Sequence, residues 1–386
     1  MRESIEALFA SLEKHVNMVK LDYPEMSVIG IGSLGVETAL PLIEQHRGDK
    51  IRVGLIYSSF DGLTAILEKL GLKQDVLRKA AVKTLEREKI SSLWPLSYEN
   101  AGGGNFFKEV KRAGLHKPKL AVIVAAAYDG LSSGIACRLA EFYRDHGVKT
   151  VFFAIMPSAD EPEVHMFNAY CALANLLGKR AADVVTLMSR DRLEKFEVID
   201  AYGKPFRGLQ ALGVMLRVLH RFVGEAEWFA HSSKELDIRH FTPLLALSTS
   251  LEIYGSIKNM LRVAAINKLL DIELDSAQCL FVYPTLLGLL SDVTHETFIR
   301  AVTAWLEGRA KLSLIHVAEP RYVKLGFDKI DLLLLIGGFK LKDLVDRVLH
   351  EGYLKFKSVA VERKLVKEEV LRDLEEALNG YLERFS

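Results

Sequence analysis

The sequence predicts an α/β protein with a doubly wound parallel sheet, a long central helix and a smaller second α/β unit. Segments 27–38 and 121–134 each run from an apolar strand through a loop of small residues into a helical pattern. Further short apolar strands alternate with helical patterns up to residue 188. This alternation is typical of parallel strands joined by crossover helices.

Composition excludes several classes of protein. The chain has 386 residues, 49% of them hydrophobic, which suffices for more than one packed core. A net charge of +1 gives no overall attraction to nucleic acid or to membranes. Cys137, Cys171 and Cys279 have neither zinc nor disulfide spacing, so we expect buried thiols in a reducing cytoplasm. No apolar run could span a bilayer, and the first residues do not resemble a signal peptide.

The first half of the chain contains the predicted parallel sheet. Residues 1–24 have helical periodicity. Strands are then predicted at 28–31, 51–56, 120–126, 151–155 and 184–188, and helices at 38–44, 64–90, 106–113, 134–146 and 163–178.

The second half begins with an apolar helix predicted at 206–222. The smaller unit is predicted from helices at 252–269 and 294–307 and strands at 278–283, 312–317 and 331–336. The final helix has an apolar stripe of Val370, Leu374, Leu378, Leu382 and Phe385. We therefore expect a nucleotide-binding domain at 1–204, a central helix and loop at 205–240, an α/β domain at 241–340 and a helical extension at 341–386.

The small-residue loops suggest a phosphate site. A loop between a strand and a helix directs backbone N–H groups and the positive end of the helix toward one point, which suits an anion. Gly30, Gly32 and Gly35 also satisfy G-x-G-x-x-G, a pattern shared with NAD-binding folds. Tyr57 and Ser58 occupy the end of the second strand, where an NAD site wants an acidic residue, and this argues against NAD.

The order of these motifs resembles the FtsZ/tubulin superfamily over about residues 25–340. Segment 28–38, V-I-G-I-G-S-L-G-V-E-T, resembles the first FtsZ loop, and 128–134, Y-D-G-L-S-S-G, falls on the tubulin signature G-G-G-T-G-[TS]-G. Segment 101–105, A-G-G-G-N, stands where a third phosphate loop is expected. Segment 235–239, E-L-D-I-R, resembles the end of the FtsZ synergy loop.

The sequence also departs from the family pattern. Tyr128, Asp129 and Leu131 replace small residues of the signature, and Asp129 would repel phosphate unless a metal ion bridges them. The base-binding Asn of the first loop is Glu37, and the guanine-reading Asn at the start of the central helix is Phe206. These changes predict weak nucleotide binding and slow hydrolysis.

The resemblance implies a GTP or GDP site, with Mg²⁺ as a candidate companion ion and no metal-binding set of side chains. The implied nucleotide contacts lie in three loops and near the ribose and base: Gly30, Gly32, Ser33, Gly35, Gly103, Gly104, Asn105, Gly130, Ser132, Ser133, Gly134, Glu161, Arg190 and Tyr202. The implied catalytic residue is Asp237, which would act on the nucleotide of the next subunit in a head-to-tail filament. The alternative for Asp237 is a surface carboxylate in a charged stretch.

Two functions from different classes follow. The first is a cytoplasmic FtsZ-like protein that binds guanine nucleotide, assembles head to tail with itself and hydrolyses GTP slowly, in cell division or cell-shape control. The second is a non-hydrolysing FtsZ-like scaffold that associates with a related protein and binds nucleotide weakly or not at all. A Rossmann-type oxidoreductase is a distant third.

Overall fold

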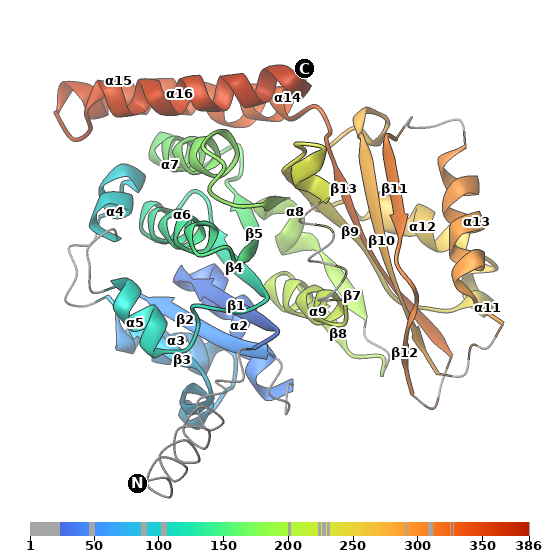
Figure 1. Cartoon of the computed structure of the whole chain (residues 1–386). Helices are drawn as coiled ribbons and strands as arrows, with labels where there is room; N and C mark the ends of the chain where they lie inside the picture. The colour runs from blue at the N-terminus through green and yellow to red at the C-terminus, as the bar shows by residue number, and fades with distance from the viewer. Residues whose placement is uncertain are drawn as a thin grey trace, which may run out of the picture.

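One continuous sheet organises the protein (Figure 1). The computed structural model describes residues 24–45, 51–85, 91–101, 106–199, 202–222, 225, 229, 232–288, 290, 292–307, 312–324, 326 and 328–385. Within these residues, the strand order is β11-β10-β13-β9-β6-β5-β4-β1-β2-β3, with β12 beside β10. The helix predicted at 1–24 lies almost wholly outside the described residues.

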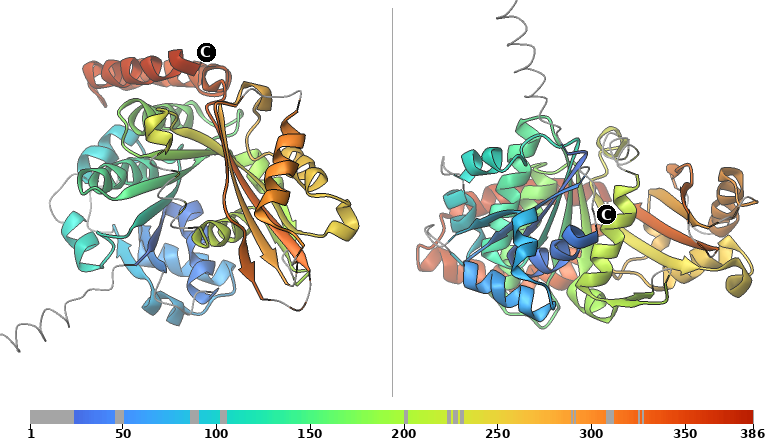
Figure 2. Two further views of the ribbon diagram at one scale, coloured as in Figure 1. Left: turned by 45° about the vertical axis from the view of Figure 1, so that its right-hand side comes forward. Right: turned by 90° about the horizontal axis from the view of Figure 1, so that it is seen from below.

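The first part of the sheet is parallel, as predicted. Its strands are β1 (Met26–Ile31), β2 (Ile51–Tyr57), β3 (Ala81–Thr84), β4 (Leu120–Ala126), β5 (Lys149–Met156) and β6 (Val184–Ser189). All residues of β1 and β4 are buried, because helices cover both faces of the sheet (Figure 2).

The crossover helices are α2 (Gly32–Gln45), α3 (Phe60–Lys69), α4 (Trp94–Ala101), α5 (Phe106–Arg112), α6 (Gly130–Asp145), α7 (Glu163–Leu173) and α8 (Arg190–Lys195). Helices α4, α6 and α7 pack against one another, and α7 continues into the π-helical turn η2 (Ala174–Gly178). The prediction of a long helix at 64–90 was wrong. After α3 the chain forms the 3₁₀ turn η1 (Gln74–Lys79) and strand β3, because Gly71 with φ of 65° ends the helix.

The central helix is shorter than predicted. It is α9 (Leu209–His220), and it is preceded by a hairpin of β7 (Glu197–Ile199) and β8 (Pro205–Arg207). Gly208 has φ of 52° and ψ of −122°, so the helix cannot extend back to Phe206. Helix α9 contacts α2 on one side and β10 and β13 on the other, so it lies between the two halves of the molecule (Figure 2).

The second unit continues the same sheet. It consists of β9 (His240–Thr249), α11 (Leu251–Tyr254), α12 (Ile257–Ile266), the 3₁₀ turn η3 (Leu274–Ser276), β10 (Cys279–Leu287), α13 (His295–Leu306), β11 (Leu314–Val317), β12 (Arg321–Val323) and β13 (Lys329–Gly337). Strand β9 was not predicted, and it is the strand that joins the two units, parallel to β6 and antiparallel to β13. The helix predicted at 252–269 is two helices, because Gly255 adopts a left-handed conformation between them.

The C-terminal segment folds back over the first unit. It comprises α14 (Leu341–Val345), η4 (Asp346–His350), α15 (Glu351–Glu362), α16 (Glu368–Leu382) and η5 (Glu383–Phe385). Helix α15 packs on α7, and α16 packs on η2, as the red hairpin of Figure 1 shows. Of the predicted apolar stripe, Leu374, Leu378, Leu382 and Phe385 are buried, and Val370 is partly buried against the core.

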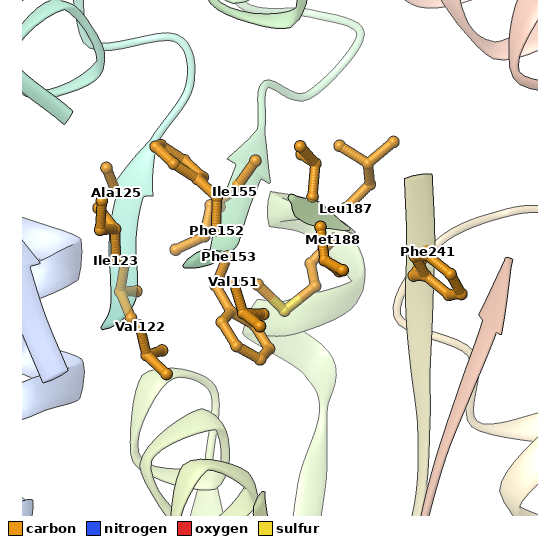
Figure 3. Close-up of a cluster of buried hydrophobic side chains, with 14 of the residues drawn as sticks. Val122, Ile123, Ala125, Val151, Phe152, Phe153, Ile155, Leu187, Met188 and Phe241 are labelled. Carbon is orange, nitrogen blue, oxygen red and sulfur yellow. The ribbon is translucent and has the colours of Figure 1, made fainter. Parts of the chain in front are cut away.

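The core runs through both units without a break. Buried side chains of β4, β5 and β6 form a row that leads toward Phe241 of β9 (Figure 3). Phe241 is also in edge-to-face contact with Phe229 and Phe281, so aromatic packing extends the core into the second unit.

Candidate nucleotide site at the carboxyl ends of the strands

The predicted phosphate loops lie at one edge of the sheet. Strands β1, β4, β5 and β6 are parallel neighbours, so the residues that follow them share the edge at their carboxyl ends. Gly32, Asp129, Ser158 and Arg190 each stand just after one of these strands. In open α/β sheets this edge is where ligands bind.

The first loop and the signature loop converge. Strand β1 passes directly into α2 at Gly32, which has φ of 70°. A Cβ atom on Gly32 would lie 1.9 Å from the Ser132 Oγ atom and 3.3 Å from a carboxylate oxygen of Asp129. The backbone of the first loop therefore lies directly against the start of α6, as the two motifs predict.

Other glycines of the two loops serve close packing. A Cβ on Gly30 would lie 2.2 Å from the carbonyl oxygen of Gly35, and a Cβ on Gly35 would lie 2.2 Å from that of Val124. A Cβ on Gly130 would lie 2.0 Å from the Ser92 carbonyl oxygen, and a Cβ on Gly134 would lie 2.7 Å from the Ser97 Cβ. These four glycines let α2 and α6 approach their neighbours, and their predicted contact with a nucleotide stays a prediction.

Asp129 occupies the position where an anion would bind to α6. It is the N-cap of α6, where its carboxylate accepts a hydrogen bond from the Leu131 N–H at 3.2 Å and another from the Ser132 hydroxyl. Ser133 donates its hydroxyl to the Asp129 carbonyl at 2.7 Å. Ser132 and Ser133 are buried, whereas Ser33 is more exposed and its hydroxyl lies 3.1 Å from that of Tyr57. The positive end of α6 thus faces a carboxylate from its own chain.

Glu161 and Arg190 meet at this edge, and their contact with a ribose or base stays a prediction. The Arg190 guanidinium donates to Glu161 and, at 2.8 Å, to Glu194. It also lies over the ring of Tyr128, 5.7 Å from the ring centroid. Burial raises the pKa of Tyr128 to about 12, so its phenol stays neutral. Because Arg190 already has these three partners, a ligand must compete for it.

Glu37, which stands where the resemblance places a base-binding Asn, also has an ion-pair partner within this chain. Glu37 is buried and forms a salt bridge with Lys69 at 2.8 Å.

Tyr202 lies apart from the converged loops: its side chain is exposed and lines a cavity of about 150 Å³ with Arg217, Arg221 and Asp331. Gly103, Gly104 and Asn105 lie outside the described residues.

Asp237 lies at the opposite edge of the sheet. It precedes β9, whose first residues pair with the start of β6, so it is at the amino ends of the parallel strands. Its carboxylate contacts three guanidiniums: Arg180 at 3.0 Å, Arg239 at 3.4 Å, and Arg384. Burial, and then the charge of Arg180, lower the pKa of Arg239. Sequence reasoning did not find this cluster, because its members come from three distant segments.

Asp129 could have been recognised as a helix cap, since aspartate directly before G-L-S-S is a typical start of a helix.

Among the described residues, no group of three or more His, Cys, Asp or Glu side chains is arranged to hold a metal ion. None of the helices in the described ranges is long and apolar enough to cross a bilayer.

Comparison with solved structures confirms the fold that the motifs predicted. A GDP-bound CetZ1 monomer from Haloferax volcanii has a TM-score of 0.62 at 17% identity, and the match covers 86% of this chain and 99% of that one. A CetZ from Methanosaeta thermophila has a TM-score of 0.63 at 13% identity, over 92% of this chain and 97% of that one. An FtsZ variant from M. jannaschii has a TM-score of 0.58 at 17% identity, and the match covers 85% of this chain and 95% of that one.

At such identities the similarity shows the fold alone. No protein-family model matches the sequence, and a comparison with curated proteins finds no match.

Proposed function

We propose that this FtsZ-like chain binds a guanine nucleotide at the carboxyl edge of its parallel strands and associates head to tail with copies of itself. The observation that carries the proposal is the contact between the two loops. Gly32 brings the backbone of the first loop against Ser132 at the start of α6. The starts of α2 and α6 therefore lie close together, and an anion between them would be near the N–H groups of both. CetZ1 of the same fold is GDP-bound, and CetZ2 of the same fold is described as a GTPγS-bound protofilament.

Hydrolysis in this proposal is slow and depends on assembly. Asp237 is at the edge opposite to Gly32, so its carboxylate would reach only the nucleotide of a neighbouring copy. The three guanidiniums around it stabilise the charged carboxylate and compete with any water that it would orient. Mg²⁺ would accompany the nucleotide and screen the phosphates from Asp129. The cellular role proposed is division or cell-shape control in the cytoplasm.

A calorimetric titration tests the nucleotide site. The unmodified protein, with Mg²⁺, should bind GTP and GDP more tightly than ATP. Gly32→Ala should abolish binding, because its methyl group would overlap Ser132 and push the two loops apart. Gly255→Ala is the matched control: Gly255 has φ of 69°, close to the 70° of Gly32, but nothing lies within 4 Å of the added Cβ. The control should bind as the parent does, and thermal unfolding would report any loss of fold.

The second candidate is a scaffold that has lost nucleotide binding and hydrolysis and pairs with a related FtsZ-like protein. The Asp129 cap favours it, because the anion position at the start of α6 already holds a carboxylate. The same titration decides between the two: if the unmodified protein binds none of the three nucleotides, the scaffold stands and the nucleotide proposal fails.

A further inference from the structure

The two edges of the parallel sheet carry opposite charge. At the carboxyl edge, each of three segments holds at least one carboxylate: Asp61 in the first turn of α3, Asp129 after β4, and Asp160 with Glu161 after β5. Glu161 is paired with Arg190 of the same edge, and the other three have no cationic partner among the described residues. Asp61 and Asp160 are exposed. We call these four residues the acidic edge.

Lysine and arginine gather at the amino ends of the same strands. Lys119 directly precedes β4, Lys149 begins β5, and Lys179 and Arg180 precede β6. Within the described ranges, the three lysines form no ion pair, and Lys119 and Lys179 are exposed. These four residues together with Arg384 make up the basic edge.

The arginine cluster adds positive charge to this edge. Arg180, Arg239 and Arg384 share the single carboxylate of Asp237, so their charge is not fully compensated. The side chains of Arg180 and Arg384 are 57% and 40% exposed, so they are accessible from outside. Asp183, a further carboxylate near this cluster, accepts a hydrogen bond from the Thr150 N–H at 2.8 Å.

The two edges cannot neutralise each other within one molecule. Strand β5 has 8 residues, which separates its ends by roughly 25 Å. The Debye length at physiological salt is only about 8 Å, so charges at opposite ends of the strands are screened from one another. A second copy that stacks its basic edge on the acidic edge of the first brings the opposite charges together, and the same contact repeats along a chain of copies.

We infer that the acidic and basic edges of this chain are complementary docking surfaces for two copies of itself, and that their charge drives association even without nucleotide. At the contact between two copies, the carboxylates of the acidic edge then supply negative charge, as the phosphates of a bound nucleotide would. This inference rests on the head-to-tail association proposed above and adds its driving force.

Removing the net charge of one edge at a time tests the inference. In the Asp61→Lys/Asp160→Lys variant, the acidic edge loses its net negative charge. In the Lys119→Glu/Lys179→Glu variant, the basic edge loses most of its positive charge. In nucleotide-free protein at about 0.05 M salt, the parent should associate in sedimentation velocity, and at about 0.5 M salt it should not. Each variant alone should stay monomeric, with association weakened roughly tenfold or more. An equimolar mixture of the two should form heterodimers, because the unchanged basic edge of the first variant can dock on the unchanged acidic edge of the second.

The control and the contrary outcomes separate this inference from the proposed function. Glu369→Lys/Asp373→Lys makes the same change in net charge as the first variant, on exposed positions of α16, and should associate as the parent does. Association of the single variants, or a mixture that stays monomeric, would overturn the inference while leaving nucleotide binding intact. A parent that stays monomeric at low salt both with and without nucleotide would instead overturn the proposed head-to-tail association itself.

Discussion

Asp129 decides how the start of α6 can be used. Its carboxylate caps the helix through the Leu131 N–H and the Ser132 hydroxyl, and both groups would otherwise be available to an anion. A fixed negative charge a few ångströms from a phosphate costs several kcal/mol in a partly buried site, roughly 4 kcal/mol at 4 Å and an effective dielectric constant of 20. The residue therefore stabilises the helix and opposes the ligand that the helix would attract.

Replacing Asp129 with serine should strengthen nucleotide binding. Serine is also a good N-cap, so α6 keeps its cap while the charge is removed. We expect the affinity for GDP, measured by calorimetry in the presence of a chelator, to rise roughly tenfold or more. The gain in GDP affinity on adding Mg²⁺ should be smaller than in the parent, because less repulsion is left for the ion to screen.

Asp160→Ser is the matched control for this change. It removes an exposed carboxylate from the neighbouring loop, where no helix cap depends on it. Its effect on affinity should be small because exposed charges are screened. Equal or weaker GDP binding by Asp129→Ser than by the parent would contradict the role given to Asp129.

Among the secondary-structure elements, α16 closes the junction between the two units. The Tyr381 hydroxyl donates to the Nδ1 atom of His240 at 2.7 Å and accepts from the N–H groups of Arg239 and His240. The Nε2 atom of His240 donates to the Phe339 carbonyl at 2.8 Å, and Phe385 packs edge-to-face on the imidazole. The end of α16 thus holds the start of β9 at the point where β9 meets β6.

This packing predicts how stability changes with pH. Burial lowers the pKa of His240 from 6.5 to about 4, so the folded protein keeps the imidazole neutral. The pKa of His240 in the folded protein lies below its pKa in the unfolded chain. The contribution of neutral His240 to the free energy of unfolding is therefore fully present above pH 6.5 and is lost as the pH drops toward 4. A pKa shift of this size corresponds to a loss of roughly 3 kcal/mol in the free energy of unfolding once the pH has fallen below the folded-state pKa.

Urea unfolding at several pH values measures this dependence. The parent should lose stability between pH 6.5 and 4 more steeply than His240→Gln, whose amide does not titrate. His240→Gln should be less stable at pH 7, since the amide does not reproduce both imidazole hydrogen bonds. Parallel curves for the two proteins over this range would show that His240 does not titrate in the way proposed.

At the scale of the whole molecule, the two candidate functional regions lie at opposite edges of one sheet. Gly32 and Ser132 are at the carboxyl ends of the strands, and Asp237 is at their amino ends. If a nucleotide binds beside Gly32, as proposed, the Asp237 carboxylate of the same copy cannot reach it across the length of the strands. In the proposed function, the two regions therefore act together only in a site shared between copies.

GTP turnover should consequently depend on assembly. The rate should rise faster than linearly with protein concentration, measured by phosphate release. Asp237→Asn should lower turnover roughly 10²-fold, the usual scale for losing a positioned acid–base group, and leave the nucleotide affinity of the monomer unchanged. Asparagine is chosen because Asp237 has φ of 52°, which asparagine tolerates and alanine resists. Turnover that is linear in concentration and insensitive to this change would exclude the shared site.

The sequence by itself determined the alternation of strands and helices, the small-residue loops and their place at one edge, because these features depend on local pattern and on the direction of parallel strands. It misjudged the start of α9 and missed β9, since a left-handed Gly208 and a strand containing Pro243 give little local signal.

Only the tertiary structure decided the partners of the charged groups. Asp237 meets Arg180 from before β6 and Arg384 from the end of the chain, and Glu37 meets Lys69 from α3. Such pairs join residues that are remote in sequence, and they form where packing of the apolar core happens to place the chain segments. The charge on each edge of the sheet could therefore be read only once the fold had brought those segments together.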